Sequence, residues 1–300
     1  MPDNRKTILV TGAGGQLGSC LRLLTPASGD SYVFTGAGDG LSAGTGRLDI
    51  TDADAVMGAV RGNKADVIIN CAAYTGVDRA EDDRYAADAI NRRGAENLAA
   101  AAKETGATLI HISTDYVFSG EKNTPYTEED AVGPASVYGA TKLAGEEAVV
   151  GSGCKCLIFR TSWLYSEFGN NFVKTILRLT AERDSIDVVF DQAGTPTYAG
   201  DLAEALFFIV ENSLYEGNDG IYHYSGEGVC SWYDFAREIT ALAGQTECRI
   251  GPCRSWQFPT KAQRPAYSVL DKAKFKMTFG IEVPYWRDSL ARAMEKLCRR

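Results

Sequence analysis

The sequence predicts an α/β protein with a Rossmann-type, doubly wound parallel sheet and a smaller α+β substrate domain toward the C-terminus. In the first half of the 300 residues, short apolar runs alternate with helical patterns, and a glycine-rich turn follows the first run. After about Leu164 the alternation loosens, and aromatic residues, glycine and proline become common. Alternating strands and helices indicate right-handed βαβ units, which build a parallel sheet.

The expected strands of the first half are short apolar segments. The runs 67–69 and 109–112 are almost continuously apolar, which is typical of strands buried on both faces of a parallel sheet. We expect strands at 8–10, 32–35, 66–70, 108–113 and 156–161, and helices over 17–24, 86–103 and 136–149.

The second half is expected to carry the last Rossmann elements and the substrate domain. We expect helices over 170–180, 200–212, 231–243 and 285–297, and a late strand at 221–224. The predicted division places an NAD(P)-binding domain in residues 1–164, with late Rossmann elements from about 198–225. Residues 165–300 are expected to form mainly the substrate-binding domain.

Composition and charge argue against two classes of protein. The net charge of −8 disfavours nucleic acid as the main partner, because that binding needs clustered Lys and Arg. No stretch approaches the roughly 20 apolar residues of a membrane span. The apolar run 7–10 is also too short for a signal peptide. We therefore expect a cytoplasmic protein without a membrane partner.

The cysteines do not suggest a metal site. The chain has eight cysteines and two histidines, and no CxxC pair occurs. The pairs closest in sequence are Cys154/Cys156 and Cys248/Cys253. This is poor material for zinc, so we predict no metal and reduced thiols.

A glycine-rich loop links the first expected strand to the first expected helix. Gly12, Gly15 and Gly18 follow the spacing GxxGxxG, which differs from the GxGxxG of the strict dinucleotide fingerprint. One glycine allows the sharp turn, one lets the backbone approach a pyrophosphate, and one permits close packing of helix and strand. The N–H groups of the helix N-terminus then face the anion. The alternative is a tight turn without a ligand, but a position in the first βα turn favours a dinucleotide site.

The choice between NADH and NADPH stays open in the sequence. An acidic residue about 20 positions beyond the loop favours NAD, because it binds the ribose 2′-hydroxyl. Asp39 lies near that position in the glycine-rich stretch 36–46, where it could equally be an ordinary loop residue. No arginine directly follows the second expected strand, which slightly disfavours NADP.

A tyrosine and a lysine four residues apart are the candidate acid–base pair. Tyr138 and Lys142 lie in one expected helix, and residues at this spacing share a helix face. A nearby cation lowers the pKa of a phenol, ordinarily about 10, so that the pair could exchange a proton near neutral pH. Ser113 and Thr114 end an apolar strand, at the sheet edge where ligands bind. The alternatives are a surface tyrosine with a solvated lysine, and an ordinary Ser/Thr turn.

Longer motifs give the chain a resemblance to the extended short-chain dehydrogenases/reductases, and within them to the dTDP-4-dehydrorhamnose reductase family. The glycine loop and the YxxxK pair are common to the whole superfamily. More specific are AAYTGVDRAE at 72–81, STDYVF at 113–118, RTSWLY at 160–165 and DQAGTPT at 191–197. Cys71 departs from the small, alanine-like residue usual at its position, and we expect it only to pack.

The resemblance implies that a hydride passes from a nicotinamide to the C4 keto carbon of dTDP-4-dehydro-L-rhamnose. Tyr138 would protonate the developing alkoxide, Lys142 would lower the tyrosine pKa and hold the nicotinamide ribose, and Thr114 would hydrogen-bond the carbonyl oxygen. The residues implied at the cofactor site are Gly12, Gly15, Gln16, Leu17, Gly18, Asp49, Ile50, Ala72, Ala73, Tyr74, Asn91, Tyr138 and Lys142.

The resemblance also implies a sugar pocket. Its expected residues are Thr75, Val77, Tyr116, Trp163 and Arg264. An aromatic residue such as Trp163 could equally pack in the core. Arg264 suits the geometry of a diphosphate, with a solvated arginine as the alternative.

Two other functions stay open. The first is another nucleotide-sugar epimerase or epimerase–reductase, which would keep its NAD bound through turnover. The second is a non-catalytic regulatory subunit of the methionine adenosyltransferase type, whose fold is similar. Intact Thr114, Tyr138 and Lys142 favour an enzyme. The expected partners are the nucleotide-sugar substrate and NADPH or NADH, and the sequence leaves a homodimer open.

Overall fold

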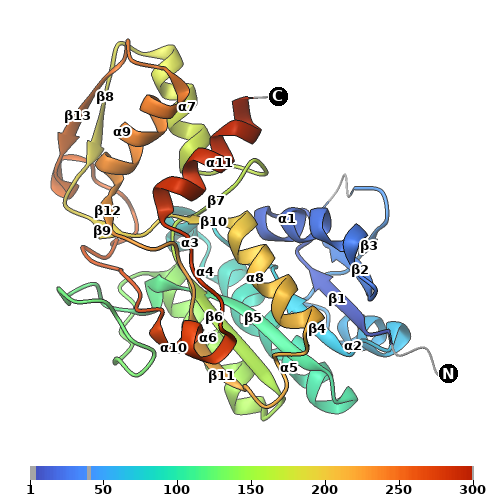
Figure 1. Cartoon of the computed structure of the whole chain (residues 1–300). Helices are drawn as coiled ribbons and strands as arrows, with labels where there is room; N and C mark the ends of the chain where they lie inside the picture. The colour runs from blue at the N-terminus through green and yellow to red at the C-terminus, as the bar shows by residue number, and fades with distance from the viewer. Residues whose placement is uncertain (1–4, 39–41, 299–300) are drawn as a thin grey trace.

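The centre of the molecule is a seven-stranded sheet (Figure 1). The computed structural model describes residues 5–38 and 42–298. The strands lie in the order β11-β6-β5-β4-β1-β2-β3, and every neighbouring pair is parallel. Their bounds are β1 (Thr7–Thr11), β2 (Ser31–Gly36), β3 (Thr45–Arg47), β4 (Val67–Asn70), β5 (Thr108–Thr114), β6 (Cys156–Thr161) and β11 (Gly220–His223). The strand order reverses between β1 and β4, where an open parallel sheet forms its ligand crevice.

Helices cover both faces of this sheet, which confirms the predicted doubly wound class. One face packs against α1 (Gln16–Leu24), α8 (Ala199–Glu211) and α10 (Ala273–Phe279). The other packs against α2 (Ala53–Asn63), α5 (Gly94–Thr105) and α6 (Val137–Ser152). In β1, Ile8 and Val10 enter the first core while Leu9 enters the second, because successive side chains of a strand alternate between faces.

The long helix expected over 86–103 is interrupted. The structure has α3 (Val77–Asp82), α4 (Arg84–Asp88), a π-helical turn over Ala89–Arg93, and then α5. The turn contains Asn91, which is buried. Such π turns occur frequently at functional sites, and this one lies beside α6.

The C-terminal part forms a second, smaller core above the carboxyl edge of the sheet (Figure 1). Its helices are α7 (Phe172–Glu182), α9 (Trp232–Ala243) and α11 (Trp286–Cys298). β8 (Ser185–Val189) pairs with β13 (Arg249–Cys253), β7 (Leu164–Tyr165) with β10 (Thr197–Tyr198), and β9 (Ala193–Gly194) with β12 (Cys230–Ser231). Within the described ranges, no helix is long and apolar enough to cross a membrane.

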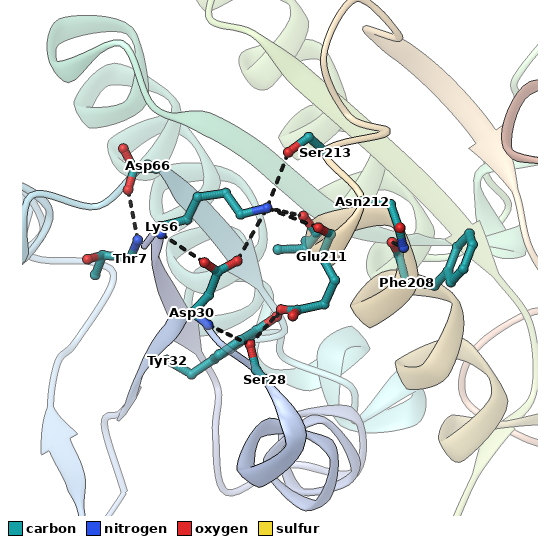
Figure 2. A network of polar contacts seen from close by, with 11 residues as sticks. Lys6, Thr7, Ser28, Asp30, Tyr32, Asp66, Phe208, Glu211, Asn212 and Ser213 are labelled. Atoms are coloured by element: carbon teal, nitrogen blue, oxygen red, sulfur yellow. Dashed lines mark hydrogen bonds and ion pairs between the residues drawn. The ribbon is translucent and has the colours of Figure 1, made fainter. Parts of the chain in front are cut away.

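A polar network closes the opposite, amino-terminal edge of the sheet (Figure 2). Lys6 Nζ donates to Val210 O at 2.7 Å and Glu211 O at 3.3 Å, at the C-terminus of α8. It also lies 3.3 Å from Asp30 Oδ2. Glu211 Oε1 accepts from Tyr32 Oη at 2.9 Å and from Ser28 Oγ at 2.7 Å. These bonds tie β1, β2 and α8 together.

Candidate active site

The glycine loop is shaped by close backbone packing. Gly12 has φ +66°, and a Cβ there would lie 2.5 Å from Ala72 N, so only glycine suits this turn. A Cβ on Gly18 would lie 2.6 Å from Gly12 O, because the first turn of α1 packs directly on the loop. Gly15 is the N-cap of α1 and offers no capping side chain, so N–H groups of the first turn remain available to an anion. The loop therefore suits a pyrophosphate.

Gln16 and Leu17 take part in this loop through their backbone, not their side chains. Leu17 is buried in the core. Gln16 Nε2 donates to Leu164 O at 3.2 Å, and Gln16 Oε1 accepts from Asn171 Nδ2 at 2.9 Å. The glutamine thus fastens the loop to the segment that leads into the second core.

The expectation based on Asp39 falls on a residue outside the described ranges. The described residues near the end of β2 include Arg47, Asp49 and Ile50. Asp49 Oδ1 accepts from Thr51 N and Oγ1 at 2.9 and 2.8 Å, while Ile50 is buried beside it. Arg47 pairs in register with Gly36, the last residue of β2, and its side chain is exposed. The cationic side chain of Arg47 therefore lies beside the end of β2, on the neighbouring strand β3.

Asn91 joins the segment after β4 to α6. Its Oδ1 accepts from Tyr74 N at 2.8 Å, and its Nδ2 lies 3.2 Å from Tyr74 O and 3.1 Å from Thr141 Oγ1. The side chain thus holds the loop that contains Ala72 and Ala73 against α6. Both alanines are half-buried and have small side chains.

Thr114 and Tyr138 meet at the carboxyl end of β5. Ser136 caps α6, its Oγ accepting from Gly139 N at 3.2 Å, and so places Tyr138 in the first turn of the helix. The Thr114 hydroxyl faces the Tyr138 phenol and opposes the rise in its pKa that burial causes. Tyr116 packs edge-on against the Tyr138 ring, with centroids 5.7 Å apart. The structure therefore brings together three residues that the sequence placed at the site.

Lys142 is fully buried one turn along α6 from Tyr138. Its Nζ donates to Ile112 O at 2.6 Å and lies 3.4 Å from His111 Nε2. Burial lowers the pKa of Lys142 to about 8, although Glu146 opposes this shift. We expected this lysine to lower the pKa of Tyr138, but burial raises the pKa of the phenol and only the Thr114 hydroxyl opposes the rise. The reason is that Lys142 contacts β5 and not the phenol.

Asp115 is a buried residue beside Thr114 that the sequence analysis did not single out. Its Oδ1 accepts from Thr114 Oγ1 at 3.0 Å. Burial raises the pKa of this carboxyl to about 6, although the nearby Ser268 and Thr114 hydroxyls oppose the rise. The motif STDYVF contained this residue, but only the fold shows that its carboxyl is desolvated.

Trp163 lies on the side of the candidate site that faces the second core. Its backbone is left-handed, with φ +47°, which is rare for a bulky residue and often marks a functional site. Its ring stacks on Trp232 at a centroid distance of 3.5 Å and an angle of 8°. A Cβ on Gly194 would lie 2.6 Å from this ring, which explains why the DQAGTPT segment has glycine there. Trp232, the stacking partner, had no signal in the sequence.

Arg264 is half-buried and ion-paired. Its Nη2 lies 2.8 Å from Asp78 Oδ2, and its Nη1 donates to Tyr116 Oη at 3.3 Å. Ala262 N donates to Asp78 Oδ1 at 3.1 Å, so the segment before Arg264 is fastened to α3. Val77 begins this helix and exposed Thr75 precedes it, which places both beside Arg264's partner.

Comparisons with known proteins agree with this geometry. The family model described as RmlD substrate binding domain matches residues 6–299. A dTDP-4-dehydrorhamnose reductase of Aggregatibacter actinomycetemcomitans is 42% identical over 290 residues, which cover 94% of this chain and 96% of that protein.

Two solved structures extend the agreement to three dimensions. The crystal structure of a dTDP-4-dehydrorhamnose reductase from Clostridium acetobutylicum superposes with a TM-score of 0.90 at 42% identity, covering 97% of this chain and 99% of that one. A second, from Bacillus anthracis in complex with NADP, superposes with a TM-score of 0.86 at 38% identity and the same coverage. This chain therefore belongs to the dTDP-4-dehydrorhamnose reductase family.

Proposed function

We propose that the protein reduces the C4 keto group of dTDP-4-dehydro-L-rhamnose to give dTDP-L-rhamnose. The observation that carries the proposal is the placement of Thr114, Tyr116 and Tyr138 together at the carboxyl edge, on the sheet that also presents the glycine loop. A phenol beside a hydroxyl is suited to protonate an oxygen that becomes an alkoxide. Membership of the family supplies the identity of the sugar.

Each residue has a separate part in the proposed reaction. Bound nicotinamide cofactor would supply the hydride. Thr114 would orient the substrate carbonyl, Tyr138 would donate the proton to its oxygen, and Lys142 would hold the cofactor ribose. Trp163 and Arg264 would bind the nucleotide sugar, the first by its ring and the second by its charge. Residues 1–164 with 198–225 would thus serve the cofactor, and residues 165–300 mainly the sugar.

We further propose that the enzyme prefers NADPH to NADH. Thr45 accepts a 2.6 Å hydrogen bond from Arg22 of α1, so it faces the side of the sheet that α1 covers. The glycine loop leads into this helix. By strand alternation Arg47 faces the same side. Among the described residues, the last two of β2 are Thr35 and Gly36, and neither is acidic. An exposed arginine at this point suits the 2′-phosphate that distinguishes NADPH.

The reduction is tested by following reduced-nicotinamide absorbance with dTDP-4-dehydro-L-rhamnose as substrate. Substrate-dependent oxidation with formation of dTDP-L-rhamnose is the expected result. A folded protein that binds the cofactor but gives no turnover contradicts the proposal. Tightly held NAD after dialysis would then favour an epimerase, and co-purification with a methionine adenosyltransferase would favour a regulatory subunit.

The cofactor preference is tested by titrating NADPH and NADH into wild-type protein and Arg47→Ala. A charged hydrogen bond to phosphate is worth about 1.5–3 kcal/mol, so the Kd for NADPH should rise roughly tenfold or more. The Kd for NADH should stay within about twofold, and Arg237→Ala, an exposed arginine on α9, should change neither. Equal effects on both cofactors would exclude a contact with the 2′-phosphate.

A further inference from the structure

A buried chain of polar side chains runs from β1 to the catalytic helix. Thr11 Oγ1 donates to Asn70 Oδ1 at 2.7 Å, Asn70 Nδ2 lies 3.0 Å from His111 Nδ1, and His111 Nε2 lies 3.4 Å from Lys142 Nζ. All four side chains are at most 2% exposed. The chain thus crosses three strands inside the sheet and ends at the lysine proposed to hold the cofactor.

The orientation of the Asn70 amide is fixed by the backbone. Asn70 Oδ1 accepts from Ala72 N at 3.1 Å as well as from Thr11. A backbone N–H can only donate, so the oxygen of the amide and not its NH₂ group must face it. The NH₂ group of Asn70 therefore faces His111 Nδ1 and donates to it.

This orientation determines the tautomer of His111. Burial holds the pKa of His111 well below its usual range, so the ring is neutral. A neutral imidazole carries one N–H. Because Nδ1 accepts from Asn70, the proton is on Nε2, the atom nearest Lys142.

An ammonium does not suit this position. Lys142 as an ammonium has only N–H groups, so one donor would face another across the contact with His111. As a neutral amine it donates to Ile112 O and accepts from His111 Nε2 through its lone pair. Both groups then satisfy their hydrogen bonds, which matters because unsatisfied polar groups are costly when buried.

The other charged and titratable groups around Lys142 do not reverse the preference of this position for the neutral amine. Glu146 on α6 favours the ammonium. However, Glu146 Oε2 lies 2.7 Å from Arg160 Nη2 of β6, and Ser113 of β5 donates to its other oxygen. Tyr138, one turn earlier on α6, is a neutral phenol whose pKa is raised by burial.

We propose that His111, held by Asn70 as the Nε2–H tautomer, stabilises the neutral amine of Lys142 in the free enzyme, and that nicotinamide cofactor binding protonates the fraction that is neutral. The ribose hydroxyl oxygens would offer the acceptors that an ammonium requires. The lysine lone pair takes one proton from solvent, and no other bond changes. This step rests on the proposed function only in assuming that the cofactor ribose reaches Lys142. His111 and Asn70 are positioning residues here.

The proposal is tested by calorimetry of NADH binding near pH 8, repeated in buffers of different ionisation enthalpy. NADH is the probe because it lacks the titratable 2′-phosphate of NADPH. With the pKa of Lys142 at about 8, about half of the lysines are neutral in the free enzyme at that pH. The expected uptake is therefore about half a proton per molecule bound. Binding without buffer-dependent heat overturns this proposal alone, whereas no binding contradicts the proposed function as well.

Variants distinguish an effect of the His111 tautomer on proton uptake from a general effect on packing. Asn70→Asp places a carboxylate oxygen opposite His111 Nδ1, moves the proton there, and leaves the Nε2 lone pair for an ammonium. Proton uptake should then disappear while NADH still binds. Thr11→Val is the matched control: Ala72 N still orients the amide, so uptake should persist. If Asn70→Asp does not fold, His111→Gln can present its oxygen to the ammonium and should reduce uptake likewise. Wild-type uptake in a folded Asn70→Asp or His111→Gln protein excludes the tautomer mechanism.

Discussion

The two edges of the central sheet differ in how far their polar groups are hydrogen-bonded. At the amino-terminal edge, Lys6 Nζ contacts the Asp30 carboxylate and the backbone carbonyls of Val210 and Glu211. The Glu211 carboxylate accepts in turn from Ser28, which completes the network (Figure 2). At the carboxyl edge, buried polar atoms lack a hydrogen-bond partner within the described part of the chain. They include Tyr74 Oη after β4, Asp115 Oδ2 after β5, Thr161 Oγ1 in β6 and His223 Nε2 in β11.

This difference separates stability from function within one sheet. A buried polar group without a partner costs about 1–3 kcal/mol, whereas a satisfied network adds to stability. The amino edge is therefore expected to stabilise the fold without affecting chemistry. The carboxyl edge is expected to lower stability and to carry the chemistry, and substitutions at the two edges should have opposite signatures.

The largest effect should come from Tyr138→Phe. The change removes the proposed proton donor but keeps the ring, so turnover should fall about 10²–10⁴-fold, the usual contribution of general acid–base catalysis. Cofactor affinity and melting temperature should hardly change. Tyr85→Phe, on an exposed tyrosine of α4, is the control and should be silent. Turnover within a few-fold of wild type would remove Tyr138 from the mechanism.

Much of the fold could be predicted because buried parallel strands are short apolar runs. β1, β2, β4, β5, β6 and β11 all lie within a residue or two of the expected segments. α2 was missed because only two of its residues, Val56 and Val60, are buried, and its pattern is correspondingly weak. β8 and β13 were missed because they form a sheet only with each other and mix exposed with buried residues, unlike the continuously buried strands of the central sheet.

The site was predictable where its members are neighbours in sequence or fall in a motif. The YxxxK pair and the end of β5 are of this kind. The stacking of Trp163 on Trp232 and the contacts of His111 with Asn70 and Lys142 join distant segments, which no local pattern encodes. Desolvation, which sets the pKa of Asp115, is likewise a property of the packed molecule.

The next effect is a pH-dependent gain in stability from Asp115→Asn. The pKa of this carboxyl is about 6 when folded and about 3.8 when unfolded, so the folded state holds its proton more tightly. Wild-type stability should therefore fall as the pH rises from about 4 to about 6, by up to about 3 kcal/mol. Asparagine does not titrate, so the variant should gain on wild type across this window while losing turnover. Urea unfolding of both proteins at several pH values measures the difference, and parallel pH curves would refute the desolvation of Asp115.

A smaller loss of stability is expected from Lys6→Met at the amino edge. The lysine interacts with the C-terminus of α8 and with Asp30, and its side chain is only 19% exposed. Its removal should lower the free energy of unfolding by about 1–2 kcal/mol and leave kcat and KM unchanged. Lys155→Met, on an exposed lysine just before β6 at the same edge, should have little effect. A kinetic defect in Lys6→Met with unchanged stability would contradict the division between the edges.

The smallest effect should come from Trp232→Leu, which tests the sugar side of the carboxyl edge. Removing the stacked ring leaves Trp163 in a left-handed conformation without its main support. Stacked aromatic pairs contribute about 0.5–1.5 kcal/mol beyond buried area, so KM for the nucleotide sugar should rise about two- to tenfold. Cofactor affinity and kcat should stay near wild type, because Trp232 lies on α9 and not on the sheet. Trp256→Leu, on a tryptophan that is 74% exposed, is the matched control. An unchanged KM in Trp232→Leu would show that Trp163 holds its orientation through Gly194 alone, whereas a rise confined to KM would assign the stacked pair to sugar binding.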